Sequence, residues 1–134
     1  MNAVQRNAMW LVLGSVIATS SLTPVAAQTA KAAPAYVMLE FTVKDPEAFK
    51  DYAQRSPATV TQHGGKFVVR PGKIIALKGD APKGPFAVLA FDSAEQAQKW
   101  ASSPEYTALV PLRDKSADVR IFSLKGYRPK RPLR

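Results

Sequence analysis

Along residues 36–43, YVMLEFTV, alternate positions form two sets of side chains, and both sets are largely apolar. This period of two predicts a strand that is covered on both faces. Apolar runs in PFAVLAF at 85–91 and ADVRIFSL at 117–124 predict two further strands. KFVVR at 66–70 and KIIALKG at 73–79 are interpreted as one bent strand or two short ones around the Pro-Gly pair between them.

A first helix is predicted to begin at Asp45, which can cap it, with Pro46 in the first helical position and Glu47 at the positive helix end. A break is expected at Ser56–Pro57, because a proline inside a helix lacks the N–H that the helix needs. A second helical stretch then runs toward His63, where the two following glycines end it.

Further helix starts occur after the third strand. Asp92 or Ser93 opens a helix with alanines and Trp100 at helical spacing. Ser103 precedes a proline and a glutamate, so it predicts another helix, which carries Tyr106 on its apolar side. The resulting order β-α-β-β-α-β predicts a ferredoxin-like α+β sandwich, with an antiparallel sheet and its helices on one face.

The other face of that sheet has no helix to cover it. Tyr36, Met38, Val68 and Phe122 are candidates to point there, so a single chain would expose a large apolar patch. Two copies packed sheet to sheet would remove this patch. We therefore expect a symmetric homodimer, in the form of a dimeric α/β barrel.

The N-terminal segment predicts export from the cytoplasm. Residues 1–27 carry one charge, an apolar run at 8–18 and a small-residue stretch that ends at Ala27, as a signal peptide does. The apolar run falls short of the ~20 residues that span a bilayer, so no transmembrane anchor is expected after cleavage. The expected product is periplasmic or secreted, with a linker at 28–35, a domain at 36–126 and a basic C-terminal tail at 127–134.

The formal net charge of +9 suggests a nucleic-acid partner until it is divided along the chain. Residues 35–124 hold 12 basic and 10 acidic residues, so most of the excess lies near the ends. Nucleic-acid binding is not expected, because neither an interleaved aromatic and basic strand face nor a suitable compartment is indicated. The tail is either a solvated appendage or a segment that binds anionic polymers or an acidic partner.

The segments DPEAFKDY, HGGKFVVRPG and FDSAEQAQKWASSPEY, followed by Arg113, resemble in order and spacing the bacterial family called domain of unknown function 1330. The resemblance covers about residues 36–126 and implies a ferredoxin-like fold within the dimeric α/β-barrel superfamily. It implies no activity. Cofactor-free monooxygenases, haem-degrading enzymes and chlorite-dismutase-like haem proteins elsewhere in the superfamily resemble this chain in fold only.

The sequence departs from that family in its export signal, in its basic tail and at Ala90, where relatives often place a carboxylate. Glu40 lies on the first strand, which neighbours the third in this fold, and is a candidate to supply that carboxylate. Glu40 and Arg70 form either a structural ion pair in the sheet interior or a site with a catalytic carboxylate.

His63 is the only histidine of the chain. It is a candidate general base at the rim of a cleft between helix and sheet, with Arg70 or Arg113 holding an anionic substrate. Trp100 and Tyr106 would then pack against that substrate, or they belong to the core. In the alternative interpretation His63 only ends a helix, where its positive form is favoured. A haem-ligand role is disfavoured, since nothing else in the sequence indicates haem.

No cofactor and no metal are expected. One histidine and no cysteine leave no recognisable ligand set, and motifs for phosphate or dinucleotide binding are missing from the sequence. The absence of cysteine also leaves no disulfide to support the fold. Two functions stay open. The first is a protein that binds a small hydrophobic or anionic molecule in a pocket between helices and sheet, either as a binding protein or as a cofactor-free enzyme. The second is a non-catalytic dimeric module of the cell envelope whose basic tail binds anionic polymers or an acidic partner.

Overall fold

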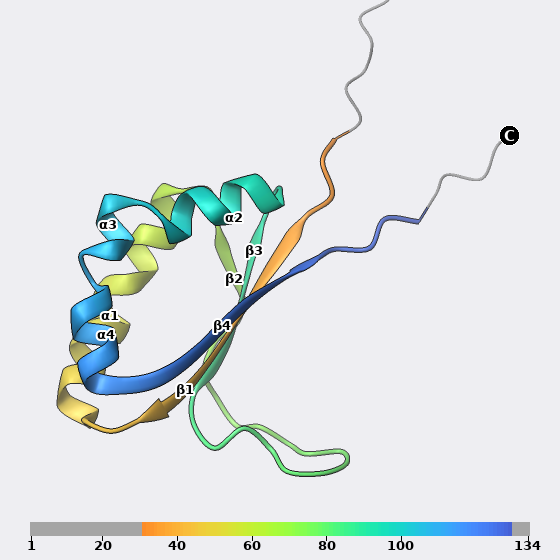
Figure 1. Ribbon diagram of the computed structural model, residues 1–134. Helices are drawn as coiled ribbons and strands as arrows, with labels where there is room; N and C mark the ends of the chain where they lie inside the picture. The colour runs from red at the N-terminus through yellow and green to blue at the C-terminus, as the bar shows by residue number, and fades with distance from the viewer. Residues whose placement is uncertain (1–30, 130–134) are drawn as a thin grey trace, which may run out of the picture.

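The computed structural model describes residues 31–129 (Figure 1). The predicted signal peptide, the first three residues of the linker (28–30) and the last five residues of the tail lie outside the described residues. The elements in chain order are β1 (Ala35–Val43), α1 (Pro46–Gln62), β2 (Lys66–Val69), β3 (Phe86–Phe91), α2 (Ala94–Ala101), α3 (Pro104–Thr107), α4 (Val110–Ser116) and β4 (Ala117–Lys125).

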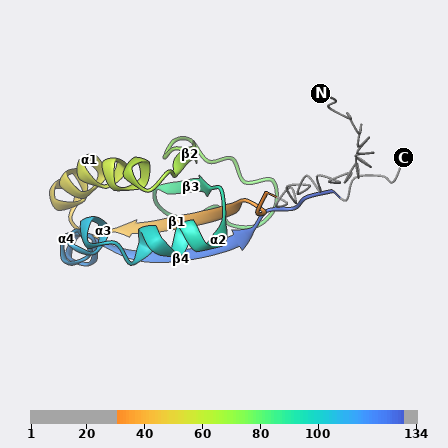
Figure 2. The same ribbon diagram turned by 90° about the horizontal axis from the view of Figure 1, so that it is seen from above.

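The four strands form one antiparallel sheet in the order β2-β3-β1-β4. The helices cover one face of this sheet and leave the other face open (Figures 1 and 2). The predicted ferredoxin-like α+β sandwich is therefore confirmed. β1 lies in the middle of the sheet, and its side chains point alternately to the two faces. Val37, Leu39 and Phe41 are buried under the helices, while Tyr36 and Met38 are half-buried on the open face.

Helix α1 begins as predicted, since the Asp45 side chain accepts a hydrogen bond from the N–H of Ala48 at 3.1 Å. The expected break at Ser56–Pro57 is wrong, because α1 runs through Pro57 without interruption. A proline removes one helical hydrogen bond. Buried Tyr52 and Val60, one on each side of the proline, hold the helix against the sheet, and this packing outweighs the local cost.

The end of α1 is set by the glycines after His63. Gly64 has φ of +72°, and its N–H bonds the carbonyl of Thr61, while the N–H of Gly65 bonds the carbonyl of Val60. These two bonds form a Schellman motif, which satisfies carbonyls that the helix end leaves free. The interpretation of His63 as a helix-ending residue is confirmed by its position at the C-cap.

The prediction of a strand at 73–79 is wrong. Residues 70–85 form an irregular loop that extends away from the sheet (Figure 1). Ile75 is 71% exposed and Leu77 is 97% exposed, so this loop contributes nothing to the core of the single chain. The apolar run is lost as a strand because β2 lies at the sheet edge and ends before Pro71.

The helical region after β3 starts at the expected residues. Ser93 caps α2 by accepting from the N–H of Gln96 at 3.1 Å, and Ser103 caps α3 by accepting from the N–H of Tyr106 at 3.2 Å. The single helix expected after Ser103 is divided into α3 and α4, and a proline stands in the first turn of α4.

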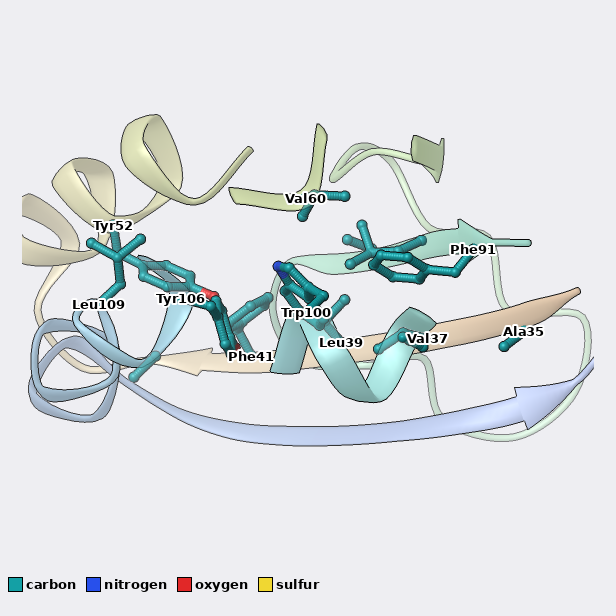
Figure 3. Close-up of a cluster of buried hydrophobic side chains, with 14 residues drawn as sticks. Ala35, Val37, Leu39, Phe41, Tyr52, Val60, Phe91, Trp100, Tyr106 and Leu109 are labelled. Carbon is teal, nitrogen blue, oxygen red and sulfur yellow. The ribbon is translucent and has the colours of Figure 1, made fainter. Parts of the chain in front are cut away.

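The core lies between the helices and the sheet, with Trp100 among residues from α1 and β1 (Figure 3). Its ring centroid is 4.2 Å from that of Tyr106 and 5.6 Å from that of Phe91. Trp100, 1% exposed, donates from Nε1 to Oγ1 of Thr59 at 3.0 Å, so its one polar group is satisfied. Among residues 31–129, no buried side-chain nitrogen or oxygen lacks a hydrogen-bond partner.

Candidate functional site

A cavity of about 130 Å³ lies between α1 and the sheet, beside Trp100. Its walls are mainly apolar and aromatic, and they come from α1, β1, β2, β3, α2 and the first residues of the 70–85 loop: Phe49, Tyr52, Ala53, Ser56, Pro57, Val60, Leu39, Phe41, Phe67, Ala87, Leu89, Trp100, Arg70 and Pro71. The lining residues Ala53, Arg70 and Pro71 are exposed, so they mark where the cavity reaches the surface.

Helical geometry explains the α1 wall. Phe49, Tyr52, Ala53, Ser56 and Val60 recur at spacings of three and four, which places them on one face of the helix. The Phe49 ring packs on Phe41 with the centroids 5.1 Å apart in an edge-on arrangement. Smaller residues in this stripe, above all Ala53 and Ser56, leave the volume between helix and sheet incompletely filled.

The Arg70 guanidinium is the only charged group among the described residues that line the cavity. It lies over the ring of Phe67, with Cζ 5.0 Å from the ring centroid, which is cation–π geometry. No carboxylate of residues 31–129 lies within ion-pair distance of it. Arg70 therefore presents uncompensated positive charge at the cavity mouth.

Tyr52 is a buried phenol in the cavity wall, with 3% of its surface exposed. Burial raises the pKa of Tyr52 well above its ordinary value of 10.0, and the neighbouring Tyr106 hydroxyl raises it further. The opposing effect of the Arg113 charge is smaller. Tyr52 is thus a neutral phenol at physiological pH.

Arg113 and Tyr106 lie together behind this wall. The Arg113 guanidinium donates from Nη1 to the Tyr106 hydroxyl at 3.0 Å, and from Nε to Oδ1 of Asp114 at 2.8 Å. Neither residue lines the cavity. Arg113 therefore fixes Tyr106, which in turn packs against Trp100. Because Arg113 does not line the cavity, it is not placed to contact a ligand there.

Comparison with known proteins gives the family. The model of the domain of unknown function DUF1330 matches residues 34–127, nearly all of the described chain. The chain belongs to the DUF1330 family. None of the curated proteins matches it.

Solved structures show the same fold as this DUF1330 domain at low sequence identity. The RPA0582 protein of Rhodopseudomonas palustris, of unknown function, is 20% identical with a TM-score of 0.58, over 72% of this chain and 85% of that one. SnoaB of Streptomyces nogalater, a cofactor-independent oxygenase, is 16% identical with a TM-score of 0.51, over 76% of this chain and 100% of that one. The hypothetical Arabidopsis thaliana protein At3g17210 is 16% identical with a TM-score of 0.57, over 76% and 96%.

The DUF1330 domain does not bring His63 to the cavity. His63 Nε2 lies 3.3 Å from Oε2 of Glu105, which joins the end of α1 to the start of α3. With Gln96 and Lys99 it borders a separate polar hollow on the surface. The predicted site that combined His63 with Arg70 and Trp100 is therefore wrong in this respect, because the Schellman turn directs the chain away before β2 begins.

Glu40 also lies elsewhere. Its carboxylate is 3.3 Å from Nη1 of Arg120 on β4, so the expected Glu40–Arg70 pair is wrong. Glu40 is paired in register with Phe86, whereas Ala90 faces Tyr36 four residues away along β1. β1 and β3 are neighbours as expected, but Glu40 is at the wrong end of the strand to replace a carboxylate at position 90.

Of the predicted site residues, the DUF1330 domain thus places Arg70 and Trp100 in the cavity lining, with Tyr106 and Arg113 behind Trp100. Phe49, Tyr52 and Ala53 stand at helical spacing in the sequence, but this periodicity did not indicate a site, since it does not reveal whether one face of a helix is fully packed. In residues 31–129, no group of three or more histidine or acidic side chains is placed to hold a metal ion. Nor does this part of the chain contain a helix with the length and apolarity needed to cross a bilayer.

Proposed function

We propose that this DUF1330 protein binds a small, largely apolar molecule in the cavity between α1 and the sheet. The observation that carries the proposal is the unfilled volume itself. Protein interiors contain few voids larger than a water molecule. The walls of this space, about 130 Å³, are mainly apolar, and a bound ligand gains roughly 25 cal/mol for each Å² of apolar surface that it removes from water. A domain without disulfides gains by filling such a space with a ligand.

The proposal concerns binding. SnoaB is a cofactor-independent oxygenase, but its likeness to this chain at 16% identity concerns the fold alone. A cofactor-free reaction, if the protein performs one, belongs at the same cavity, where Tyr52 is the buried proton-bearing group.

The cavity has a built-in reporter. The sequence contains two tryptophans, Trp10 in the predicted signal peptide and Trp100 in the cavity wall. In the chain from Gln28 onward, tryptophan fluorescence therefore comes from the cavity alone. A saturable change on titration with toluene, a neutral single-ring probe, is the expected result.

Two matched variants make this test specific. Ala53→Phe places a ring in the cavity mouth and should abolish the fluorescence response, whereas Ala58→Phe adds the same ring to the same helix outside the cavity and should preserve it. Ala53 and Ala58 are both exposed, so both variants should fold. The proposal fails if the unmodified chain gives no saturable response, or if Ala53→Phe responds as the unmodified chain does.

We also propose that the protein is a homodimer that packs through the open face of the sheet. Support comes from apolar side chains on that face: Val68, Phe122 and Leu124 are 48%, 41% and 50% exposed, beside half-buried Met38. Sedimentation analysis should give a dimer that Phe122→Glu converts to monomer. Ser123→Glu, on the opposite face, is the control and should stay dimeric. A monomeric unmodified chain at micromolar concentration would overturn the proposal.

We also propose, from residues 1–27, that the protein is exported. N-terminal sequencing of the mature protein from the periplasm or medium tests this, and Gln28 is the expected first residue.

The alternative role is a module whose basic tail binds anionic polymers or an acidic partner. It predicts a salt-sensitive association that truncation after Gly126 removes. In the described part of the tail, Arg128 donates to the carbonyl of Ala32 at 2.7 Å.

A further inference from the structure

The size of the cavity limits its ligand to a single ring. A dry cavity of about 150 Å³ in another protein accepts benzene. The volume here, about 130 Å³, is slightly smaller. One six-membered ring therefore fits inside, and any substituent larger than a few atoms must extend through the mouth. Two fused rings exceed the space.

The walls favour an aromatic ring over an aliphatic one. Five aromatic side chains line the cavity: Phe41, Phe49, Tyr52, Phe67 and Trp100. Phe41, Phe49 and Tyr52 lie within 5.1 to 6.0 Å of one another in edge-on or tilted arrangements. Aromatic pairs in such arrangements gain about 0.5–1.5 kcal/mol beyond the burial of their area, so a flat guest ring adds contacts of the same kind.

The mouth favours an anion. Arg70 is the one charged lining residue, and the cavity walls contain no carboxylate among the described residues. Cζ of its guanidinium lies 5.0 Å from the centroid of the ring of Phe67, which also lines the cavity. A guanidinium fork matches the two oxygens of a carboxylate. The cation–π contact with Phe67 favours a position of the Arg70 guanidinium at the mouth, where it can pair with such a carboxylate.

We propose that the ligand is a single-ring aromatic carboxylate, with its ring in the cavity and its carboxylate paired to Arg70. This inference rests on the proposed binding function and adds the chemical class. It assigns to Arg70 the role of selecting an anion, and to the volume between α1 and the sheet the role of excluding larger ring systems.

Three probes separate these contributions, each followed by Trp100 fluorescence. Benzoate has the right ring and charge, benzyl alcohol has the ring without the charge, and 2-naphthoate has the charge with a second ring. Benzoate should bind at least about tenfold more tightly than benzyl alcohol, the ratio expected when a charged hydrogen-bonded pair is formed. 2-Naphthoate should not compete with benzoate.

Arg70→Gln should reduce the preference for benzoate over benzyl alcohol to about one. Arg55→Gln makes the same charge change on the exposed surface of α1, away from the cavity, and should keep the preference. Equal affinities of the unmodified chain for benzoate and benzyl alcohol would overturn the carboxylate assignment while leaving the binding function intact. Tight binding of 2-naphthoate would overturn the single-ring limit. Failure of every probe, toluene included, would instead remove the proposed function.

Discussion

Replacing Thr59 with valine measures what the buried hydrogen bond to Trp100 contributes to stability. Thr59 is 6% exposed, accepts from Trp100 Nε1 at 3.0 Å and donates to the carbonyl of Ser56 at 2.7 Å. Valine has nearly the same shape, so the change creates no cavity, and its helix propensity is close to that of threonine. It leaves the indole N–H buried without a partner, which costs about 1–3 kcal/mol.

We expect Thr59→Val to lower the free energy of unfolding by about 2 kcal/mol, which corresponds to a fall in Tm of about 10 °C for a domain of this size. Urea unfolding followed by circular dichroism measures the change. Thr59→Ser keeps the hydroxyl and should lose less, about 1 kcal/mol for the missing methyl group.

A double-mutant cycle assigns the loss to this pair. In a Trp100→Phe background there is no indole N–H to leave unpaired, so Thr59→Val should cost at least about 1 kcal/mol less than it does in the unmodified chain. An equal cost in both backgrounds, or a cost below about 0.5 kcal/mol in the unmodified chain, would show that the hydrogen bond does not contribute as argued.

Three further predictions concern a carboxylate, a phenol and a glycine. The pKa of Glu105 is held below 4.5 by its own backbone N–H and by the His63 imidazole. The ionised carboxylate therefore stabilises the fold above pH 4.5, and this contribution is lost as the pH falls below that value. Glu105→Gln should have a lower urea midpoint than the unmodified chain at pH 7, and the two midpoints should converge in acid. The pKa of Tyr52 is raised above 10.0 by burial, so the stability of the fold falls as the pH rises past 10.0, where the tyrosine of the unfolded chain ionises. Because Tyr52 stays protonated in the folded protein, Tyr52→Phe should leave the tyrosinate absorbance titration of the native state unchanged until the protein unfolds in alkali. Gly65→Ala would place Cβ 2.5 Å from the Phe91 ring and should lose about 1–3 kcal/mol in urea unfolding, while Gly72→Ala, with its nearest contact at 3.9 Å, should change stability little.

Helix starts were predictable because their signals are local. Asp45, Ser93 and Ser103 each accept a hydrogen bond from an N–H three residues further along the chain. Such a contact forms whenever the helix forms, so its partners can be identified from spacing alone. The end of α1 at the glycines after His63 has the same local origin.

The predictions that failed depended on distant partners. Pro57 has the same local cost in any helix, but packing of the residues around it decided that α1 continues. Residues 73–79 have the composition of a strand, yet they form a loop because no strand is available for pairing beyond β2 at the sheet edge. Glu40 found its partner Arg120 across β1 and β4, which are 80 residues apart along the chain at this pair.

By itself, the sequence determined the helix starts, the end of α1, the ferredoxin-like fold and the family resemblance. These follow from capping contacts within a few residues, from the period of apolar positions and from the order of the motifs. Only the tertiary structure decided the site. A cavity is the difference between the space that α1, the sheet and Trp100 enclose and the volume their side chains fill, and that difference depends on how elements far apart in the sequence come together. The same assembly brought Arg70 to the cavity mouth and left His63 outside.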